Sequence, residues 1–523
     1  MINDLKTSGT HISYWTNSVV PRMYKPLDKN IDTDIVIVGG GISGITMAYE
    51  LTLRGRDVVI IEDGMIGSGE TGRTTAHLTC ALDDRYYHLE NVHGKEKAKL
   101  AAESHNAAIG YIETIVKNEQ IDCDFERLDG YLFLHPSDKI ESLKKEFEAT
   151  REAGLKTEWL DNVPGIGKES GPCIKFPAQA QFHIMKYLHG LCTAIEKRNG
   201  KIFTETHAAK IDEKGIETTG KHRVNANHVV IATNTPVNNR FVIHTKQSPH
   251  RTYVIGARVQ KGLSKALWWD TGDQEIKGTA QPYHYVRMAA LDDQHDLLIC
   301  GGEDHMTGVA DNDVPEENRY GRLEQWTRER FPVEEVVYRW SGQVMEPMDG
   351  MAFIGRNPMD SDNTYIVTGD SGNGMTHGTI AAMIIPDLIE GKQHPWAGLY
   401  DPDRFKFLSV GQNFIRDNTI VVRELIKGYA HHPELKALRE VKKDEGRIVE
   451  IKGEKYGAYR DARDMLHIVS VQCPHLGCIV RWNNDENSWD CPCHGSRFTI
   501  EGKVINGPSN SDLSYYHFPE ETF

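Results

Sequence analysis

Four residues near the end of the chain have the types and the spacing of metal ligands. Cys473 and His475 form one half-site, and Cys491 and His494 form a second, with fifteen residues between the two. Cysteine thiolates suit soft iron–sulfur centres, and replacing two thiolates by imidazoles gives a cluster in which one iron carries two histidines. Paired Cys/His half-sites also hold structural zinc, so the ligand types alone leave both metals open.

The residues around these ligands favour the cluster over zinc. A zinc site has no use for the Leu-Gly pair after His475, the Gly-Ser pair after His494, or the later Gly507-Pro508. The whole stretch closely resembles the cluster-binding loops of Rieske proteins from cytochrome bc-type complexes, where the first and last of these segments cover the cluster. The resemblance therefore implies a Rieske 2Fe-2S cluster held by Cys473, His475, Cys491 and His494.

The same resemblance gives expectations for further residues of the two loops. Cys478 and Cys493 occupy the positions that form a disulfide between the cluster loops in that family. Ser496 stands where a serine donates a hydrogen bond to a cluster sulfide. High-potential members have a tyrosine two residues later, whereas this chain has Phe498. Because one donor to the cluster is missing, we expect a potential below the upper end of the family's range.

A second set of residues with chemical meaning lies near the start of the chain. The apolar segment 34–38 predicts a buried strand, and Gly39, Gly41 and Gly44 follow it at the spacing GxGxxG. A helical segment and a second strand ending at Glu62 complete the order of a dinucleotide-binding unit. The pyrophosphate would rest on the positive N-terminus of the helix, and Glu62 would accept hydrogen bonds from the ribose hydroxyls.

Two further glycine-rich segments indicate FAD rather than NAD. Residues 67–77 read GSGETGRTTAH, and residues 363–378 read NTYIVTGDSGNGMTHG and precede a helical segment. Both resemble the segments that enclose FAD in the D-amino-acid oxidase and sarcosine oxidase superfamily. No cysteine lies in 341–349, where sarcosine oxidases attach their flavin, so a dissociable FAD is expected. The fingerprint and the resemblance together give the expected FAD contacts: Gly39, Gly41, Ser43, Gly44, Glu62, Gly72, Arg73, Thr74, Thr75, Gly372, Gly374, Met375 and Thr376.

The order of these motifs predicts the fold class. We expect an α/β Rossmann-like FAD domain with an inserted α+β substrate domain, followed by a small all-β Rieske domain. Alternating apolar residues over 252–259, 283–288 and 297–301 predict an antiparallel sheet in the substrate domain. Residues 401–423 predict a helical return across the FAD domain.

The expected boundaries follow from the same order. The FAD-dependent oxidoreductase spans 1–425 and the Rieske domain spans 430–523. Within the first, the FAD-binding parts lie at about 30–81, 150–235 and 333–425, and the substrate-domain parts lie at about 82–149 and 236–332.

Four residues are candidates for the substrate side of the flavin. Arg287 would hold a substrate carboxylate with its planar guanidinium group. His377, in the second glycine-rich segment, would lie near the carbonyl edge of the flavin, while Tyr253 and His284 stand on strands expected to face the substrate. Each could instead be a structural or exposed residue. Orientation and charge stabilisation can support hydride transfer to the flavin without a side-chain base, so none is assigned.

Composition limits the classes of function. The 523 residues carry a net charge of −15, so nucleic acid and anionic membranes are not expected as partners. No apolar run approaches the length of a membrane span, and the first residues lack the apolar core of a signal peptide. The five cysteines outside the cluster stretch show no pairing pattern. These features together predict a cytoplasmic enzyme.

Two redox centres in one chain suggest an order of electron transfer. In the flavin family that the chain resembles, a C–N bond of an amine or amino acid gives a hydride to FAD, and water hydrolyses the resulting imine. A Rieske cluster takes one electron at a time, so we expect electrons to pass from FAD through the cluster. The final acceptor is expected to be an external one-electron carrier protein or a quinone-like acceptor.

Three alternatives remain open at the level of sequence. The protein could be an oxygen-using amine oxidase with a structural or sensing cluster, an electron-transfer protein, or a reductase fed through the cluster. A mononuclear-iron Rieske oxygenase is disfavoured, because no catalytic domain with its own His/His/carboxylate site follows the cluster. The sequence leaves the oligomeric state open.

Overall fold

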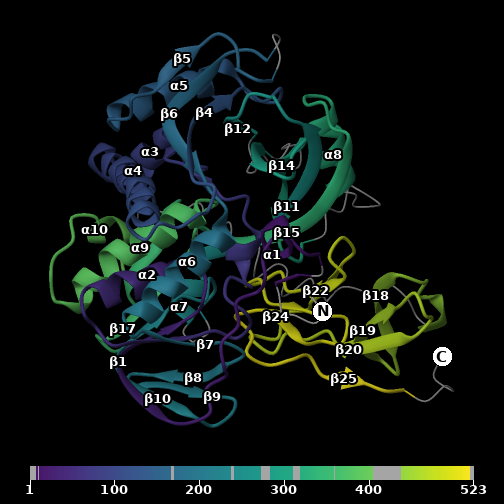
Figure 1. Cartoon of the computed structure of the whole chain (residues 1–523). Coiled ribbons are helices and arrows are strands. Elements are labelled where there is room, and N and C mark those ends of the chain that lie inside the picture. The colour runs from purple at the N-terminus through teal and green to yellow at the C-terminus, as the bar shows by residue number, and fades with distance from the viewer. Residues whose placement is uncertain are drawn as a thin grey trace.

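The structure is a computed structural model with four β-sheets arranged in three regions (Figure 1). It describes residues 8–9, 11–166, 170–236, 241–272, 283–309, 319–358, 360–404 and 438–518. Most of the helical return expected over 401–423 lies outside these residues. Among the helices that the structure describes, none combines the length and apolarity needed to cross a membrane.

The first sheet is the Rossmann-like layer expected from the glycine fingerprint. Its central strand β1 (Ile31–Val38) pairs in parallel with its neighbours on both sides. Ile35, Val36 and Ile37 are fully buried, because helices and loops cover both faces of a parallel sheet. The strand order is β16 (Phe353–Arg356), β17 (Thr364–Thr368), β10 (Arg223–Ile231), β1, β2 (Val58–Ile61) and β7 (Lys201–Phe203), with the hairpin β8 (Ala208–Asp212) and β9 (Gly215–Thr218) paired to β10.

Apolar helices cover this sheet and place the glycine segments at its edge. Helix α2 (Ile42–Leu53) begins directly after the fingerprint, and α9 (Gly374–Ile389) begins in the second glycine segment. The two helices pack side by side, and α6 (Ile184–Lys197) lies next to α2 (Figure 1). Their N-termini therefore meet at the carboxyl ends of the parallel strands, the usual binding edge of such sheets.

The second sheet has nine strands and stands above the first in Figure 1. The antiparallel pairs of β11 (Gln247–Gln260) with β14 (His295–Met306), and of β14 with β13 (His284–Ala290), confirm the sheet expected over 252–259, 283–288 and 297–301. The order is β15 (Glu335–Pro347), β11, β14, β13, β12 (Leu267–Asp270), β4 (Glu126–Phe133), β6 (Cys173–Gln181) and β3 (His77–Leu78), with β5 (Glu158–Leu160) beside β6.

Helices accompany this second sheet: α8 (Arg319–Arg328) packs against β11 and β14, and α5 (Ile140–Glu152) contacts β6. Helices α3 (Tyr86–His93) and α4 (Lys95–Asn118) pack on α5, and α4 also packs on α9. The mixture of helices and a largely antiparallel sheet confirms an α+β region inserted into the Rossmann-like part. Strands β3, β5, β6 and β15 come from intervals that the sequence assigned to the FAD-binding parts, so the two regions exchange strands more often than expected.

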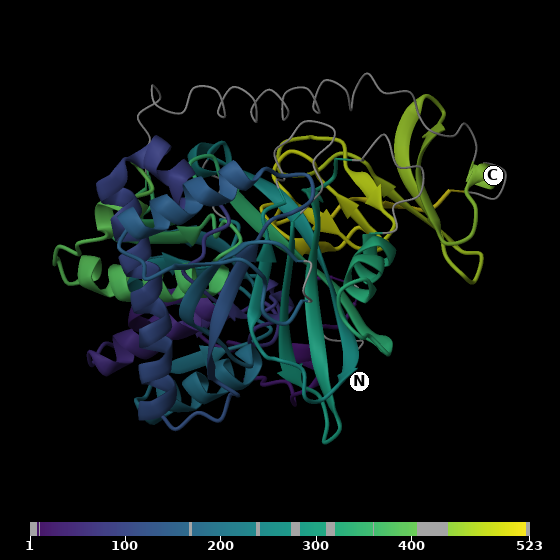
Figure 2. The same ribbon diagram turned by 90° about the horizontal axis from the view of Figure 1, so that it is seen from above.

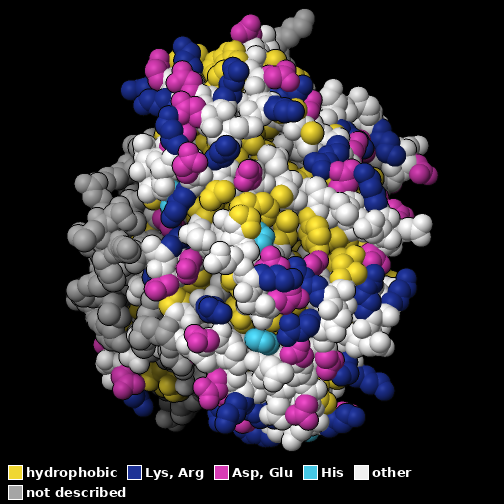
Figure 3. All heavy atoms as spheres, turned by 90° about the vertical axis from the view of Figure 1, so that its left-hand side faces the viewer, with side chains coloured by type: hydrophobic (Ala, Val, Ile, Leu, Met, Phe, Trp, Pro, Cys, Tyr) yellow, Lys and Arg dark blue, Asp and Glu magenta, His cyan; other side chains and the backbone are white. Residues whose placement is uncertain are grey.

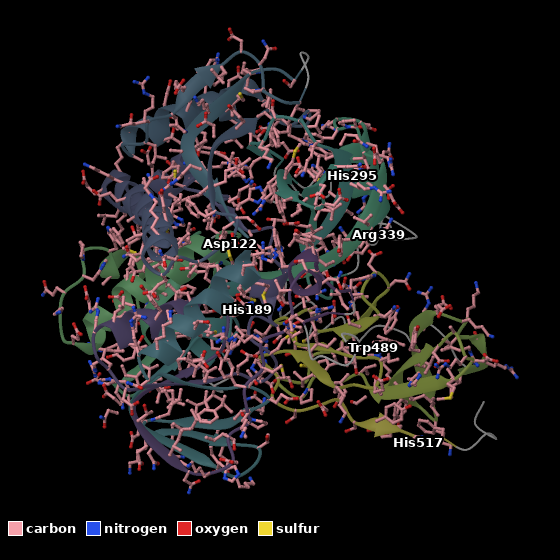
Figure 4. The ribbon with its side chains drawn as sticks, viewed as in Figure 1. Asp122, His189, His295, Arg339, Trp489 and His517 are labelled. Carbon is pink, nitrogen blue, oxygen red and sulfur yellow. A yellow bond between two sulfur atoms is a disulfide. The ribbon has the colours of Figure 1, made fainter. Side chains whose placement is uncertain are left out.

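The C-terminal region is all-β, as expected, and consists of two small sheets. One contains β18 (Glu445–Ile451), β19 (Glu454–Arg460), β20 (Leu466–Ser470) and β25 (Tyr515–Tyr516). The other contains β21 (Arg481–Asn483), β22 (Ser488–Asp490), β23 (Arg497–Phe498) and β24 (Val504–Asn506). Trp489, labelled in Figure 4, is fully buried and packs against Gly457 of β19, so it joins the two sheets.

The C-terminal region lies against the rest of the molecule rather than apart from it. Figure 2 shows its strands beside the long strands of the second sheet. The contacts include Gly308 against Pro492 and Pro249 against Gly495. Acidic and basic side chains are interspersed over the face shown in Figure 3, which offers no extended basic patch.

Candidate flavin cavity and cluster site

A cavity of about 320 Å³ lies at the carboxyl ends of the parallel strands. Val38 and Ile61, the last residues of β1 and β2, are part of its lining. It is also lined by ten of the residues expected to contact FAD: Gly39, Gly41, Ser43, Glu62, Arg73, Thr74, Thr75, Gly372, Gly374 and Met375. Three further expected residues, Gly44, Gly72 and Thr376, do not line it.

The glycines of the fingerprint fit the cradle of a dinucleotide. Gly39 has φ 117°, and a Cβ atom there would lie 2.3 Å from the Ala232 carbonyl oxygen. A Cβ at Gly44 would lie 1.9 Å from the Gly39 carbonyl oxygen, so Gly44 serves the contact between helix and turn. Gly41 is the N-cap of α2 and supplies no capping side chain. The helix N-terminus is therefore suited to a pyrophosphate.

Glu62 lies where the ribose of a dinucleotide would be held. Its carboxylate accepts hydrogen bonds from the backbone N–H groups of Gly40 at 2.6 Å and Gly64 at 2.8 Å. Burial nevertheless raises the pKa of the Glu62 carboxyl. Together with the glycine cradle, these contacts show that the residues present fit FAD.

Two of the four substrate-side candidates lie on the wrong face of their strands. Thr252 and Val254 line the cavity, whereas Tyr253 between them packs against Tyr320 and His305 on the other side of β11. The expected strands are present. Because successive side chains of a strand point to opposite faces, the expectation for Tyr253 was wrong by one residue.

The expectation that His284 faces the substrate was also wrong by one residue. Tyr283 and Tyr285 line the cavity, while His284 lies behind the sheet and binds Asp270 with Nδ1–Oδ2 at 3.0 Å. Its ring stacks on Trp326 with centroids 4.2 Å apart. Burial opposes protonation of His284, but the hydrogen bond to Asp270 and its neighbour Glu303 leave the pKa raised.

Arg287 does not face the cavity and does not hold a carboxylate. Its guanidinium donates to the backbone carbonyls of Ala76 at 2.6 Å, Thr75 at 3.2 Å and Phe182 at 3.2 Å, and it lies over the Trp15 ring. Burial lowers its pKa to about 9. The physical role of Arg287 is therefore to hold the glycine-rich segment 67–77 in place.

His377 is the one substrate-side candidate that lines the cavity. Its Nδ1 atom lies 2.8 Å from the Asp370 carbonyl oxygen and must carry the proton to donate there. Burial lowers the pKa of His377 to about 4, so the ring is neutral and Nε2 carries a lone pair. Among the residues described, Nε2 has no hydrogen-bond partner.

The cavity also contains residues that the sequence reasoning missed. Its lining includes the aromatic side chains of Trp269, Tyr283 and Tyr285 and the carboxyl groups of Asp83 and Asp304. The signal for the two tyrosines was present, because they alternate with His284 on a strand that was expected. Asp83 and Asp304 carried no recognisable motif.

The second site is formed by two loops of the C-terminal region. Cys473, Cys491 and His494 are buried and His475 is partly buried, and the two imidazole rings lie 5.0 Å apart between centroids. Cys478 and Cys493 form a disulfide, as the resemblance implied. Cys473 and Cys491 are left as free thiols, so the structure brings two cysteines and two histidines together as the expected ligand set.

Backbone N–H groups lie close to both cysteine sulfurs, but the pKa is lowered only for Cys473, because the hydrogen bond with Cys473 and burial raise the pKa of Cys491 well above its usual value. A hydrogen bond with Cys491 is the largest cause that lowers the pKa of Cys473 to about 7, and the N–H groups of His475 and Leu476 lower it further. Ser496 also donates to Cys473, and its Oγ accepts from the Ser509 N–H at 3.0 Å. Thiolates surrounded by backbone donors and two neutral imidazoles fit a Rieske cluster.

The two histidines of the cluster site differ in exposure. His494 is buried, and burial together with His475 lowers its pKa to about 4. Both rings face His244 at the end of α7 (Phe241–His244), with centroids 5.2 Å from His475 and 5.9 Å from His494. Only His475 remains partly accessible, because the rest of the molecule covers its neighbour.

The cavity and the cluster site are adjacent. Residues 504–507 and 509–510 of the C-terminal region line the cavity together with the FAD-side residues. Gln343, also in the lining, donates from Nε2 to the Gly495 carbonyl oxygen at 3.1 Å, directly after His494, one of the expected ligands. Asn506 donates to Glu70 at 2.9 Å, in the glycine-rich segment 67–77.

A buried ion cluster holds the two parts together. Glu486, between β21 and β22, is fully buried and lies 3.3 Å from Arg251, 3.6 Å from Arg73 and 3.7 Å from Arg497. The Tyr320 hydroxyl donates to it at 2.9 Å. Burial would raise the pKa of Glu486, but a hydrogen bond from His11 and the three arginines hold it well below its usual range. Arg73, expected to contact FAD, is thus also a contact between the two parts.

Comparison with known proteins agrees with both sites. The family model described as FAD dependent oxidoreductase matches residues 34–388, and the model described as Rieske [2Fe-2S] domain matches residues 432–517. The Rieske 2Fe-2S iron–sulfur protein YhfW of Bacillus subtilis is 32% identical over 506 residues, which cover 96% of each chain.

Two further proteins match about three quarters of the chain. The gamma-glutamylputrescine oxidoreductase of Escherichia coli is 26% identical over 394 residues, covering 72% of this chain and 89% of that protein. The crystal structure of glycine oxidase from Geobacillus kaustophilus superposes with a TM-score of 0.59 at 19% identity, covering 72% of this chain and all of that one. The likeness to glycine oxidase shows a shared fold.

Proposed function

Because the chain belongs to the family of FAD-dependent oxidoreductases and carries a Rieske domain at its C-terminal end, we propose that it oxidises an amine or amino acid and passes the electrons through the Rieske cluster. When bound, FAD supplies a hydride acceptor, and the cluster supplies a one-electron acceptor. The substrate C–N bond becomes an imine, which water hydrolyses to a carbonyl compound and ammonia, or an amine where the nitrogen carries a substituent. An external one-electron carrier takes the electrons in two single steps.

The observation that carries this proposal is the shared lining of the flavin cavity. A cluster with only a structural role has no need to lie beside the cavity. Here residues 504–507 and 509–510 form part of the cavity wall, and Gln343 connects that wall to Gly495 through one hydrogen bond. This short connection supports electron transfer within the molecule rather than between separate molecules.

The position of the two cluster histidines supports a direction through the protein. His494 is covered, whereas His475 is partly accessible next to the exposed Leu476. We propose that the covered side receives electrons from the flavin and that the surface around His475 meets the external carrier. The named relatives support an amine or amino acid as substrate, since one is a gamma-glutamylputrescine oxidoreductase and one a glycine oxidase.

Steady-state turnover with and without an intact cluster tests this function. The purified protein is supplied with candidate amines and amino acids under nitrogen, with a one-electron protein or dye as acceptor, and in air with a peroxide assay. We expect turnover that requires the acceptor and is lost in a His475→Ser variant that still binds FAD. Equal amounts of peroxide and product in air, unchanged by His475→Ser, would instead establish an oxygen-using oxidase.

A further inference from the structure

The charge of the cavity indicates which amines fit it. Four carboxylates line it near the aromatic walls: Asp83 before α3, Asp304 in β14, Glu346 in β15 and Asp370 after β17. They come from four separate segments and meet in one cavity, so their convergence does not reflect a run of acidic sequence. Burial raises the pKa values of all four carboxyls, and for Asp304 and Asp370 to about 7.

Neutral groups donate hydrogen bonds to Asp83, Glu346 and Asp370. The Tyr283 hydroxyl donates to Asp83 at 2.6 Å, the Ser371 hydroxyl donates to Glu346 at 2.9 Å, and the Met345 N–H donates to Asp370 at 3.0 Å. In the part of the chain that the structure describes, no ion pair involves Asp83, Glu346 or Asp370. Burial disfavours the ionised form of these carboxyls and neutral donors compensate for it only in part, so a cationic ligand in the cavity would be favoured because it stabilises the carboxylates.

The cationic side chains close to the cavity are engaged elsewhere. Arg73 is the single lysine or arginine among the lining residues, and it binds the Ser341 and His11 carbonyls and Glu486. Arg287 binds backbone carbonyls outside the cavity. A substrate carboxylate would therefore meet carboxylates rather than a guanidinium group.

Two further features of the lining fit an ammonium or amine group. Tyr283 and Tyr285 lie 5.2 Å apart between ring centroids and, with Trp269, offer aromatic faces that attract cations. The buried Nε2 atom of His377 carries a lone pair and has no partner among the described residues, so it can accept from an N–H group. Both features add to the carboxylates, because an aromatic face and an imidazole lone pair attract a cation or an N–H group without themselves carrying a charge.

We propose that the substrate is an alkyl diamine or polyamine, whose second ammonium group is held by Asp83 and Asp304 against the walls formed by Tyr283 and Tyr285. This inference rests on the proposed function and narrows its substrate class. At the reacting end the amine is unprotonated, and the carbon bonded to its nitrogen gives a hydride to FAD and becomes the carbon of an iminium ion. Water then adds to it, giving an aldehyde and ammonium, and the reduced cofactor is reoxidised by the one-electron acceptor.

Binding and flavin reduction by matched ligands test the proposal in the unmodified holoenzyme. Under nitrogen, 1,4-diaminobutane is compared with 4-aminobutanoate, which has a carboxylate in place of the second ammonium, and with N-methylglycine. We expect the diamine to bind about tenfold to a hundredfold more tightly than 4-aminobutanoate, the range of one to two charged hydrogen bonds. Calorimetry measures binding and the loss of flavin absorbance measures reduction.

Variants of Asp83 and Asp304 test whether these two residues cause the tighter binding of the diamine. Asp83→Asn and Asp304→Asn should each weaken diamine binding about tenfold and leave FAD content unchanged, while Asp122→Asn, an exposed position labelled in Figure 4, should have no effect. The diamine proposal would be overturned if 4-aminobutanoate or N-methylglycine bound more tightly than 1,4-diaminobutane, or if both variants bound the diamine as the wild type does. The proposed function would still stand if either of those ligands reduced the flavin. Failure of every amine and amino acid to reduce the flavin would overturn both.

Discussion

Replacing Glu486 by glutamine tests whether the Rieske domain and the flavin cavity form one unit. Glu486→Gln keeps the size of the side chain but removes the negative charge that Arg73, Arg251 and Arg497 share. Arg251 and Arg497 are fully buried and Arg73 is 3% exposed as a side chain, so solvent cannot replace the lost carboxylate. Removing one partner of a buried ion pair costs about 3–5 kcal/mol.

Glutamine can still accept a hydrogen bond from Tyr320, so we expect the lower end of this range. About 3 kcal/mol corresponds to about a hundredfold weaker association between the two parts. Arg73 belongs to the cavity lining, so part of this loss should appear as weaker FAD binding. Titration of FAD into the apoprotein by flavin fluorescence measures that loss, and thermal unfolding followed by both cofactor signals measures stability.

The wild type should also show an acid dependence that the variant lacks. The pKa of Glu486 is held well below its usual range, so its contribution is complete above the usual carboxyl pKa and is lost as the pH falls through the lowered value. Glu450→Gln, an exposed position on β18, is the matched control and should change neither property. An unchanged FAD dissociation constant and unfolding midpoint in Glu486→Gln would refute the coupling.

Four further outcomes are expected. Phe498 is fully buried beside Cys473 and Cys491. A tyrosine at this position could donate one hydrogen bond to the cluster, so Phe498→Tyr should raise the cluster potential by about 40 mV, the equivalent of about 1 kcal/mol. A redox titration that finds the same potential in the variant would contradict this expectation. Gln343→Met should slow reduction of the cluster, but not of the flavin, in stopped-flow measurements. Cluster reduction as fast as in the wild type would exclude Gln343 from the electron-transfer path between flavin and cluster. Gln472→Met, at an exposed position, is the control. Diamine affinity should rise between about pH 6 and about pH 8 as the Asp304 carboxyl ionises. Burial, Asp83 and Glu303 raise the pKa of Asp304, and Thr252 and His284 lower it. An affinity that calorimetry finds unchanged over this pH range would contradict a role of Asp304 in binding the diamine. Acid precipitation should release FAD into the supernatant, and a yellow pellet would indicate a covalent link.

The sequence was sufficient where chemistry depends on short motifs. The spacing of Cys473, His475, Cys491 and His494 predicted a ligand set that the structure brings together, because two compact loops supply all four residues. Ten of the residues that the glycine segments indicated line the cavity, because backbone approach to a dinucleotide restricts the residue at each position. The overall fold class followed from the order of these motifs.

The residues that face the substrate side of the cavity could be identified only from the structure. The strands that carry Tyr253 and His284 were predicted, but their faces were not, because an error of one residue moves every side chain to the opposite side. Arg287 has the right chemistry for a carboxylate, yet its contacts with Ala76 and Thr75 depend on segments far apart in the chain. Asp83 and Asp304 become neighbours only through tertiary packing.

The interface between the two parts also lies beyond sequence reasoning. Glu486 is an ordinary acidic residue in a polar loop, and nothing nearby indicates that three arginines surround it. His244 is similarly isolated in sequence but lies against both cluster histidines. Such contacts follow from the docking of one domain on another, which local patterns do not encode.

Photoreduction of the flavin provides the most direct test of the central claim, because it needs no substrate. The holoprotein is illuminated under nitrogen with a sacrificial electron donor, and flavin absorbance and the Rieske electron paramagnetic resonance signal are recorded together. The account predicts that the cluster signal rises as the flavin is reduced, and that it stays small in protein freed of FAD under the same light. A fully reduced flavin beside a cluster that remains oxidised would contradict it.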